Sequence, residues 1–251
     1  MADPVLPAPF TWRGAHVHAH LPGGEVLFTT RRGGVSQGPY ASLNLGPWTE
    51  DDATAVDANR RRVAVAVGRP VVGVRQVHGT DVREVGAKDA DRDPREAPVE
   101  ADALLTVEPE LAIGVVVADC LPVAFVGQDV VGMAHAGWRG LAGGVLERTV
   151  QRLRARPGGQ TLVAAIGPAA RGCCYEVGDE VRSAFAEHGA AVRAGRRIDL
   201  PAIATRLLRG LGISEVHDTG LCTLCAPADL LFSHRRDGGL TGRQMGLAWR
   251  S

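Results

Sequence analysis

Lysine is almost absent from this 251-residue chain, although basic and acidic side chains balance at 28 each. Lys88 is the only lysine, and it lies in the sequence Gly-Ala-Lys-Asp. A Walker-type phosphate loop needs lysine followed by serine or threonine, so the chain has no such loop. Schiff-base chemistry would have to use Lys88, which we expect in an acidic, exposed loop. We attribute the arginine bias to codon composition.

The chain also lacks a basic leader, a long apolar run and a surplus of positive charge. Residues 1–10 carry no apolar core typical of a signal peptide, and no apolar run reaches the roughly 18 residues of a membrane span. We therefore expect a cytoplasmic protein without membrane contact. Charge neutrality argues against a dedicated nucleic-acid binder. Five cysteines are too few for a disulfide scaffold, and in a reducing compartment they are free thiols or metal ligands.

Short, valine-rich segments bounded by glycine or proline predict strands. They lie at Ala15–His20, Val26–Thr30, Val71–Gln76, Ala103–Thr106, Ala112–Val117, Val123–Val126, Val130–Ala134, Leu162–Ile166 and Val216–Asp218. Helices are predicted at Thr54–Val67, with Thr54 as N-cap, and at Gly144–Arg154, Val181–Glu187 and Leu200–Leu211, the last capped by Asp199. Strands and helices do not alternate regularly, which favours an α+β fold with mixed β-sheets flanked by helices. We expect one domain over 1–251, with loops rather than linkers at Gly86–Glu100 and Ala155–Gln160.

Residues with metal-binding chemistry follow several of the predicted strands. They are His78, Cys120 and His135, and each lies within two positions of a glycine or proline. Two imidazoles and a thiolate suit zinc, and three protein ligands leave a fourth position open for water or substrate. The spacing alone is a weak signal, because a lone histidine or buried cysteine is more often structural.

The ordered motifs give a more specific signal. They are Thr29–Ser36 with Ser42–Leu45, Gln76–Gly79, Ala118–Pro122, His135–Gly140, Ile166–Pro168 with Cys173–Gly178, and Ser233–Asp237 with Thr241–Arg243. From about Thr29 to about Trp249 the chain resembles the YfiH family, the laccase-domain or polyphenol-oxidase-type proteins reassigned as zinc-dependent purine nucleoside phosphorylases. The resemblance implies zinc at His78, Cys120 and His135. It also implies a fold distantly similar to the catalytic domain of cytotoxic necrotizing toxins.

The function implied by this resemblance is phosphorolysis of adenosine, inosine, guanosine and methylthioadenosine, together with adenosine deamination. Purine nucleosides and phosphate would be the partners of an enzyme that we expect to be a monomer. Our hypothesis assigns phosphate binding to Arg31, Arg139 or Arg243, and ribose or base contacts to Asn44 and Tyr175. Asp119 is a candidate base or ligand-orienting group, although a side chain next to a strand ligand usually points the other way. Gly33-Gly34 is either a hairpin turn or an anion-binding nest.

Three other functions remain open. A copper-binding polyphenol oxidase is poorly supported, because the chain has eight histidines in all and no His-Cys-His sequence. A thiol hydrolase or amidase acting on cell-wall precursors would use Cys120 as nucleophile and His135 as base. A non-catalytic interaction protein would use the three ligands as a structural clip.

Three further patterns stand outside this assignment. Cys222 and Cys225 form a single CxxC pair, which is a weak zinc signal even if Cys173 and Cys174 could complete a four-thiolate site. We interpret these four as ordinary residues of the fold. His16, His18 and His20 alternate with strand period, so they should share one face of a surface or edge strand. His234 stands where the family usually has tyrosine, which leaves the role of that position open.

Overall fold

Two six-stranded β-sheets form the centre of the molecule in a computed structural model that describes residues 3–90, 92–93, 95, 98–156, 161–189 and 193–251. The first sheet has the order β1 (Thr11–Arg13), β2 (His16–Leu21), β3 (Gly24–Phe28), β14 (Gln244–Arg250), β7 (Ala112–Val117), β4 (Val71–Gly73). The second has the order β13 (Val216–Asp218), β10 (Val163–Ile166), β8 (Leu121–Val126), β9 (Val131–Ala136), β6 (Ala103–Thr106), β5 (Val82–Glu84). Both sheets are mixed, with the parallel pairs β4–β7, β5–β6 and β10–β13 at their edges.

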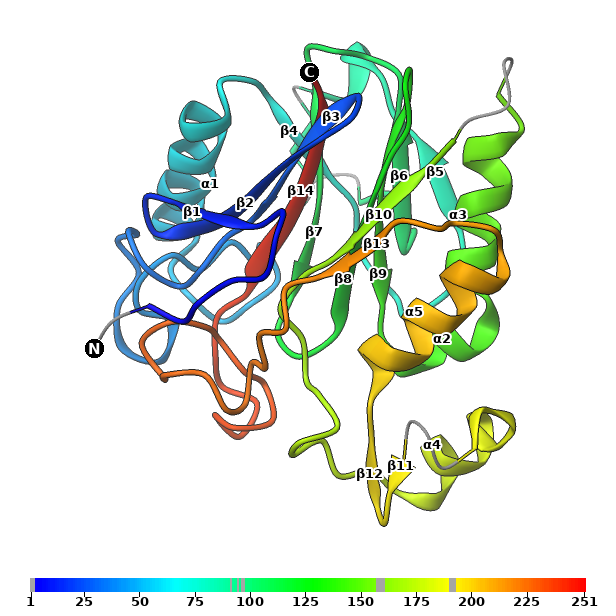
Figure 1. The fold of residues 1–251 in the computed structure, drawn as a ribbon. Helices are drawn as coiled ribbons and strands as arrows, with labels where there is room; N and C mark the ends of the chain where they lie inside the picture. The colour runs from blue at the N-terminus through cyan, green and yellow to red at the C-terminus, as the bar shows by residue number, and fades with distance from the viewer. Residues whose placement is uncertain (1–2, 91, 94, 96–97, 157–160, 190–192) are drawn as a thin grey trace.

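Helices cover the outer face of each sheet (Figure 1). Helix α1 (Ala53–Val67) lies on the first sheet, and α2 (Trp138–Gly143), α3 (Val145–Arg154) and α5 (Leu200–Gly210) lie on the second. Helix α4 (Asp179–Ala184) and the small β11–β12 hairpin (Arg193–Ala194, Arg197–Ile198) extend from one end. Short 3-10 turns occur at Gly38–Tyr40, Ala87–Asp89 and Ala186–His188.

The layers follow from alternation along the buried strands. Val131 and Met133 of β9 belong to the apolar core between the sheets, whereas Ala134 and Ala136 belong to the core under α3 and α5. Because successive side chains of a strand point to opposite faces, His135 faces the space between the two sheets. A third core joins α1 to the outer face of the first sheet. This arrangement confirms the predicted α+β class with mixed sheets and flanking helices.

The predicted strands each overlap an observed one, but several elements were missed. Strand β14 lies at the centre of the first sheet between β3 and β7, and its first six residues are buried. Its run of buried residues on both faces lacks the alternation that marks a half-exposed strand. The short edge strands β1 and β5 were missed as well. The predicted helix at Val181–Glu187 is split into α4 and the turn at Ala186–His188.

One predicted helix cap is wrong. Asp52, not Thr54, caps α1, because the Asp52 carboxylate accepts a hydrogen bond from the Thr54 amide at 2.9 Å. The predicted cap of α5 is confirmed, since the Asp199 side chain accepts from the Ala202 amide at 3.0 Å. The loop predicted at Gly86–Glu100 contains the turn at Ala87–Asp89, and its residues 91, 94 and 96–97 lie outside the described part. Most of the second predicted loop, residues 157–160, also lies outside it.

The three histidines of β2 share one face, as the alternation predicts. His18 Nε2 and His20 Nδ1 each contact the Glu25 carboxylate of β3 at 2.6 Å, and His16 Nδ1 accepts from the Thr30 amide at 3.3 Å. Within the described ranges, none of the helices has the length and apolar character that a membrane crossing requires.

Candidate metal centre

His78, Cys120 and His135 meet where three segments of the two sheets end. Cys120 lies in the turn between β7 and β8, His135 lies on β9, and His78 follows β4. One donor atom from each residue lies within 4.8 Å of the others, and Cys120 Sγ is 3.8 Å from His78 Nε2. The two imidazole rings meet edge to face, with centroids 4.8 Å apart. Two nitrogens and one sulfur at this spacing form a candidate metal site.

Asp102 holds two of these residues in place, and it was missed in the sequence. Its carboxylate accepts hydrogen bonds from the backbone amides of Val77, His78 and Gly79 at 2.6 to 3.1 Å. It also pairs with His135 Nδ1 at 2.7 Å. A metal-binding histidine usually uses its second ring nitrogen in this way, which fixes the ring orientation and leaves Nε2 for the metal. Asp102 precedes β6 and is fully buried, but neither this burial nor its contacts with the chain near His78 can be recognised in the sequence.

Burial and neighbouring charges set the protonation of the site. Burial alone raises the pKa of the Cys120 thiol, but the adjacent His135 and His78 imidazoles outweigh it and lower that pKa to about 6. Burial lowers the pKa of His135, but the Cys120 thiolate and Asp102 outweigh it and raise that pKa to about 9. Burial also disfavours the Asp102 carboxylate, yet the hydrogen bonds from His135 and from backbone amides keep its pKa below the usual value. At neutral pH the metal-free site therefore holds a thiolate–imidazolium pair.

This pairing predicts how metal binding depends on pH. The metal needs thiolate and neutral imidazole, so between about pH 7 and pH 9 binding must displace the His135 proton. We expect about one proton released per zinc and an affinity that rises about tenfold per pH unit in this range. Calorimetry in buffers of different ionisation enthalpy measures the proton count. An affinity independent of pH from 7 to 9 would contradict the assigned charge state.

Gly137 lets the three ligands approach one another. A Cβ at this position would lie 2.7 Å from His78 Cδ2 and 3.1 Å from Cys120 Sγ. We expect Gly137→Ala to lower zinc affinity at least about tenfold and to reduce the free energy of unfolding by about 1–3 kcal/mol, since the added methyl group displaces packed side chains. Metal titration and urea unfolding measure the two effects. Gly178→Ala is the matched control, because Gly178 is also an extended helix N-cap and its Cβ would meet nothing within 4 Å. Equal zinc affinity and equal free energy of unfolding in Gly137→Ala and Gly178→Ala would contradict this role of Gly137.

Comparisons with known proteins identify the family of the chain. Residues 25–251 match the family model described as multi-copper polyphenol oxidoreductase laccase. A Pseudomonas aeruginosa protein named purine nucleoside phosphorylase is 41% identical over 236 residues, which cover 90% of this chain and 93% of the relative. The YlmD protein of Geobacillus stearothermophilus, also named a purine nucleoside phosphorylase, is 35% identical over 255 residues, which cover 91% and 90%. The chain belongs to the YfiH/YlmD laccase-domain family.

Solved structures of YfiH/YlmD proteins share the fold. The crystal structure of G. stearothermophilus YlmD superimposes with a TM-score of 0.87 at 33% identity, over 97% of this chain and 99% of that one. The Bacillus licheniformis YfiH structure gives a TM-score of 0.85 at 30% identity, over 98% and 100%. This chain therefore shares its overall fold with both of these solved proteins.

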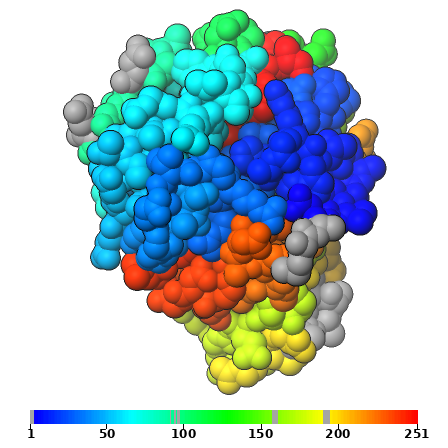
Figure 2. Space-filling view, turned by 90° about the vertical axis from the view of Figure 1, so that its left-hand side faces the viewer, coloured from blue at the N-terminus to red at the C-terminus, as the bar shows by residue number. Residues whose placement is uncertain are grey.

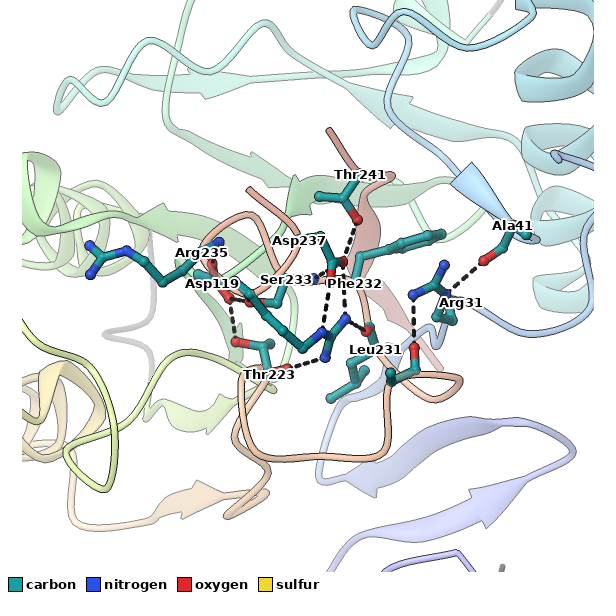
Figure 3. Close-up of polar contacts among 12 residues, drawn as sticks. Arg31, Ala41, Asp119, Thr223, Leu231, Phe232, Ser233, Arg235, Asp237 and Thr241 are labelled. Atoms are coloured by element: carbon teal, nitrogen blue, oxygen red, sulfur yellow. Dashed lines mark hydrogen bonds and ion pairs between the residues drawn. The ribbon is translucent and has the colours of Figure 1, made fainter. Parts of the chain in front are cut away.

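Asp119 points away from the three candidate ligands. Its carboxylate accepts hydrogen bonds from Thr223 Oγ1 at 2.6 Å, Ser233 Oγ at 2.7 Å and the Arg235 amide at 2.7 Å (Figure 3). Asp119 has a φ of +88°, a left-handed conformation that is rare outside glycine. The carboxylate thus anchors the segment after β13 next to Cys120. This placement supports a positioning role for Asp119.

Arg31 and Asn44 also hold loops. Arg31 donates from Nε to the Ala41 carbonyl at 2.6 Å and lies over the Phe232 ring at 4.4 Å (Figure 3). Asn44 is buried, donates to Thr49 Oγ1 at 2.8 Å and accepts from the Arg243 amide at 2.8 Å. Through these contacts, both side chains hold neighbouring loop segments in place.

The Gly33-Gly34 segment is a loop whose amides are engaged by protein acceptors. The Gly34 amide donates to Ser42 Oγ at 3.1 Å, and the Val35 amide donates to Asn59 Oδ1 at 2.9 Å. A Cβ at Gly34 would lie 2.1 Å from the Ser42 carbonyl oxygen, so only glycine allows this close approach. The segment is therefore a loop rather than a hairpin turn, and its use as an anion nest stays a prediction.

A pocket of about 290 Å³ opens beside the candidate metal site. It is close to the lower end of the size range of small-molecule sites. Arg243, His234 and Gln76 line it together with the three candidate ligands, and Trp48 forms part of its wall. Trp48 is 42% exposed, which is unusual for a large aromatic side chain. Trp48 and Gln76 were not among the predicted site residues. Trp48 was missed because the exposure of a tryptophan cannot be recognised without the fold.

Tyr175 and Arg139 are not among the residues that line this pocket. Burial raises the pKa of Tyr175, with a smaller contribution from the Cys120 charge, and the Arg235 guanidinium lies 5.2 Å from the Tyr175 ring centre. Arg139 is largely exposed, lies 4.2 Å from the Trp138 ring centre and is 3.9 Å from Glu180 Oε1. Of the three predicted phosphate-binding arginines, Arg243 therefore lines the pocket.

Proposed function

We propose that this chain is a zinc-dependent purine nucleoside phosphorylase with adenosine deaminase activity. The observation that carries the proposal is the position of Arg243 and the three candidate metal ligands around one pocket. An anionic co-substrate and a nucleoside need a cation and a polarising centre in the same cavity, and this pocket offers both. The names of the P. aeruginosa and G. stearothermophilus relatives support the assignment.

The donor set of the site fits zinc. Two imidazoles and a thiolate are ligands that zinc prefers, and three protein ligands are typical of a catalytic rather than a closed structural site. His135 Nδ1 is already taken by Asp102, which leaves Nε2 as its metal-binding atom. When bound, zinc supplies Lewis-acid polarisation of a substrate or water oxygen.

The residues of the pocket then divide the work of phosphorolysis. Arg243 binds phosphate and holds it on the side of the nucleoside from which an oxygen attacks the ribose C1′ carbon. The bond between C1′ and the purine nitrogen breaks, and its electron pair leaves with the base, which takes up a proton. Trp48 stacks on the purine, and His234 hydrogen-bonds its edge. Asn44 and Arg31 keep the loops of the pocket in place.

Product analysis tests the proposal directly. Metal-quantified protein is incubated with adenosine and phosphate, and adenine, ribose-1-phosphate and inosine are measured. We expect ribose-1-phosphate in an amount equal to the sum of adenine and hypoxanthine, and only when phosphate is present, whereas inosine should form in its absence as well. Arg243→Ala should suppress phosphorolysis far more than deamination, because deamination does not use phosphate. Equal loss of both reactions in this variant would contradict phosphate binding by Arg243.

Trp48 gives a prediction on substrate affinity. Removal of a stacking aromatic ring costs about 1–3 kcal/mol per base, so Trp48→Ala should raise the KM for adenosine by about 5- to 150-fold. Trp48→Phe keeps a stacking face and should restore most of the affinity. Steady-state kinetics with adenosine at saturating phosphate measures both variants. An unchanged KM in Trp48→Ala would place the base elsewhere.

A thiol hydrolase is a second candidate, because the metal-free site has the geometry and charge of a nucleophile with its base. The pKa of Cys120 is lowered to about 6, and His135 beside it is oriented by Asp102, as in a cysteine–histidine–acid arrangement. Metal content separates the two functions. A hydrolase would be active without metal and would lose activity on alkylation of Cys120, whereas the phosphorylase would lose activity on metal removal.

The family description favours copper oxidation, but within the described ranges only two clusters of three or more metal-ligating side chains occur, and one of these has no histidine.

A further inference from the structure

A second cluster of cysteines lies apart from the three candidate ligands. The Sγ atoms of Cys173, Cys174, Cys222 and Cys225 all lie within 4.8 Å of one another. Cys174 Sγ has three sulfur neighbours, at 3.6 Å from Cys173, 3.4 Å from Cys222 and 3.1 Å from Cys225. The sulfurs therefore surround a common centre.

The structure assigns a closed four-thiolate zinc site to these cysteines. Zinc binds thiolates at about 2.3 Å, so the corners of a tetrahedral site are about 3.8 Å apart. Four of the six sulfur separations are 3.1 to 3.6 Å, slightly shorter than that edge, and none of the six exceeds 4.8 Å, so only a small rearrangement around the ion is needed. They are also far longer than a disulfide bond of about 2.0 Å. Four thiols lose their protons on binding, and the complete ligand set leaves no open position, so this zinc is structural rather than catalytic.

Two tight turns present the four sulfurs. In the first turn, the amides of Cys174 and Tyr175 donate to the Arg171 carbonyl at 3.1 and 2.8 Å. In the second, the Ala226 amide donates to the Cys222 carbonyl at 2.9 Å and closes the CxxC segment. A backbone bridge between Ala169 and Cys222 fixes the register of the two turns. The cluster is thus held by backbone geometry and not by the sulfurs alone.

The surroundings suit the charge of such a site. Zinc with four thiolates carries a net charge of −2, which nearby cations must offset. Arg197 Nη1 donates to the Cys173 carbonyl at 2.7 Å, which brings its guanidinium beside the cluster. Arg171 pairs with Asp218 through two hydrogen bonds of 2.8 Å at the base of the first turn. Cys173 and Cys225 are exposed, so an ion can enter from solvent.

The site would clamp together two segments that meet at the candidate metal centre. The segment after β13, orange to red in Figure 2, lies against the yellow-green segment that leads to α4. Thr223, next to Cys222, donates to the Asp119 carboxylate at 2.6 Å, and the Ala170 amide donates to the Asp119 carbonyl at 2.8 Å. Asp119 precedes Cys120, so the clamp holds the loop that supplies the thiolate of the first site.

Metal counting tests the assignment without any activity measurement. Reduced, purified protein should retain two zinc ions per chain by mass spectrometry of the metal content, and Cys120→Ala should retain one. Cobalt(II) added to zinc-free Cys120→Ala should give the intense visible bands and sulfur charge-transfer absorption of a tetrahedral thiolate site. Cys225→Ser in the same background should lose that spectrum, whereas Ala228→Ser, an exposed neighbour in the same segment, should keep it.

Two results would overturn the assignment. Cys120→Ala that folds normally but binds neither zinc nor cobalt would rule out the second site. Freshly purified protein whose intact mass lacks one or two pairs of hydrogens would show that the cysteines form disulfides instead. Because the test uses a chain without the Cys120 thiolate, it does not depend on the phosphorylase proposal. Loss of phosphorolysis with two zinc ions still bound would count against the proposed function alone.

Discussion

Cys120→Ala is expected to abolish phosphorolysis and deamination together. The substitution removes the sulfur from the candidate site and leaves two imidazoles, which hold zinc poorly. Loss of Lewis-acid stabilisation costs several kcal/mol, so kcat/KM should fall at least about 1000-fold for both reactions. Adenine, ribose-1-phosphate and inosine are measured by chromatography after incubation with adenosine, with and without phosphate. Zinc content is measured on the same sample.

The control for this variant is His20→Ala. His20 is a histidine on β2 with an exposed side chain that pairs with Glu25, and it belongs neither to the candidate metal site nor to the lining of the pocket. It should keep the zinc content and the activity of the unsubstituted chain. Continued adenine release by Cys120→Ala at more than a few per cent of the original rate would refute the zinc mechanism. Loss of activity with two zinc ions still bound would instead favour Cys120 as a nucleophile.

The sequence allowed the three candidate ligands to be predicted but not their support. His78, Cys120 and His135 each follow a predicted valine-rich strand, which is a weak signal of convergence, and the resemblance to the YfiH family made the prediction specific. Asp102 gave no comparable signal, because its function depends on amides of the chain near His78 that it meets only in the folded state. The same holds for Trp48, whose exposure and place on the pocket wall are properties of the fold.

The sheets were predictable to a similar degree. Short apolar segments such as Ala112–Val117 are recognisable from composition, and the structure has a strand with those bounds. Strand β14 was missed because its residues alternate between two buried faces and contain glycine, which weakens any periodic signal. The order of strands depends on long-range pairing, as between β14 and both β3 and β7, and no local pattern encodes it.

The cysteines illustrate the same limit. A single CxxC pair is a weak signal, so Cys222 and Cys225 were interpreted as ordinary residues of the fold. Cys173 lies 52 positions from Cys225 in the sequence, yet their sulfurs are 3.5 Å apart. The bridge between Ala169 and Cys222 produces this proximity, and it exists only when the loop after β10 lies beside the loop after β13.

Asp102→Asn should be the most damaging isosteric substitution in the molecule. The Asp102 carboxylate is fully buried and accepts from three backbone amides and from His135 Nδ1. An amide group has one acceptor oxygen, so its NH₂ would face donors and leave buried N–H groups unsatisfied. Loss of the charge also leaves the buried His135 cation with the Cys120 thiolate as its one remaining anionic partner among the causes that raise its pKa. We expect the free energy of unfolding to fall by about 3–5 kcal/mol and zinc affinity to fall about 10- to 100-fold.

Urea unfolding of the metal-free protein and competitive zinc titration measure these two effects separately. Asp129→Asn is the matched control, since Asp129 is exposed and its pair with Arg250 at 3.3 Å is worth less than about 1 kcal/mol. A positioning role also predicts that Asp102→Asn lowers the pKa of His135, because the carboxylate that favours its charged form is gone. NMR titration of the imidazole resolves this shift, which a purely structural contact would leave unchanged. Stability and zinc affinity equal to those of Asp129→Asn would show that the fold holds His78 and His135 in place without the carboxylate.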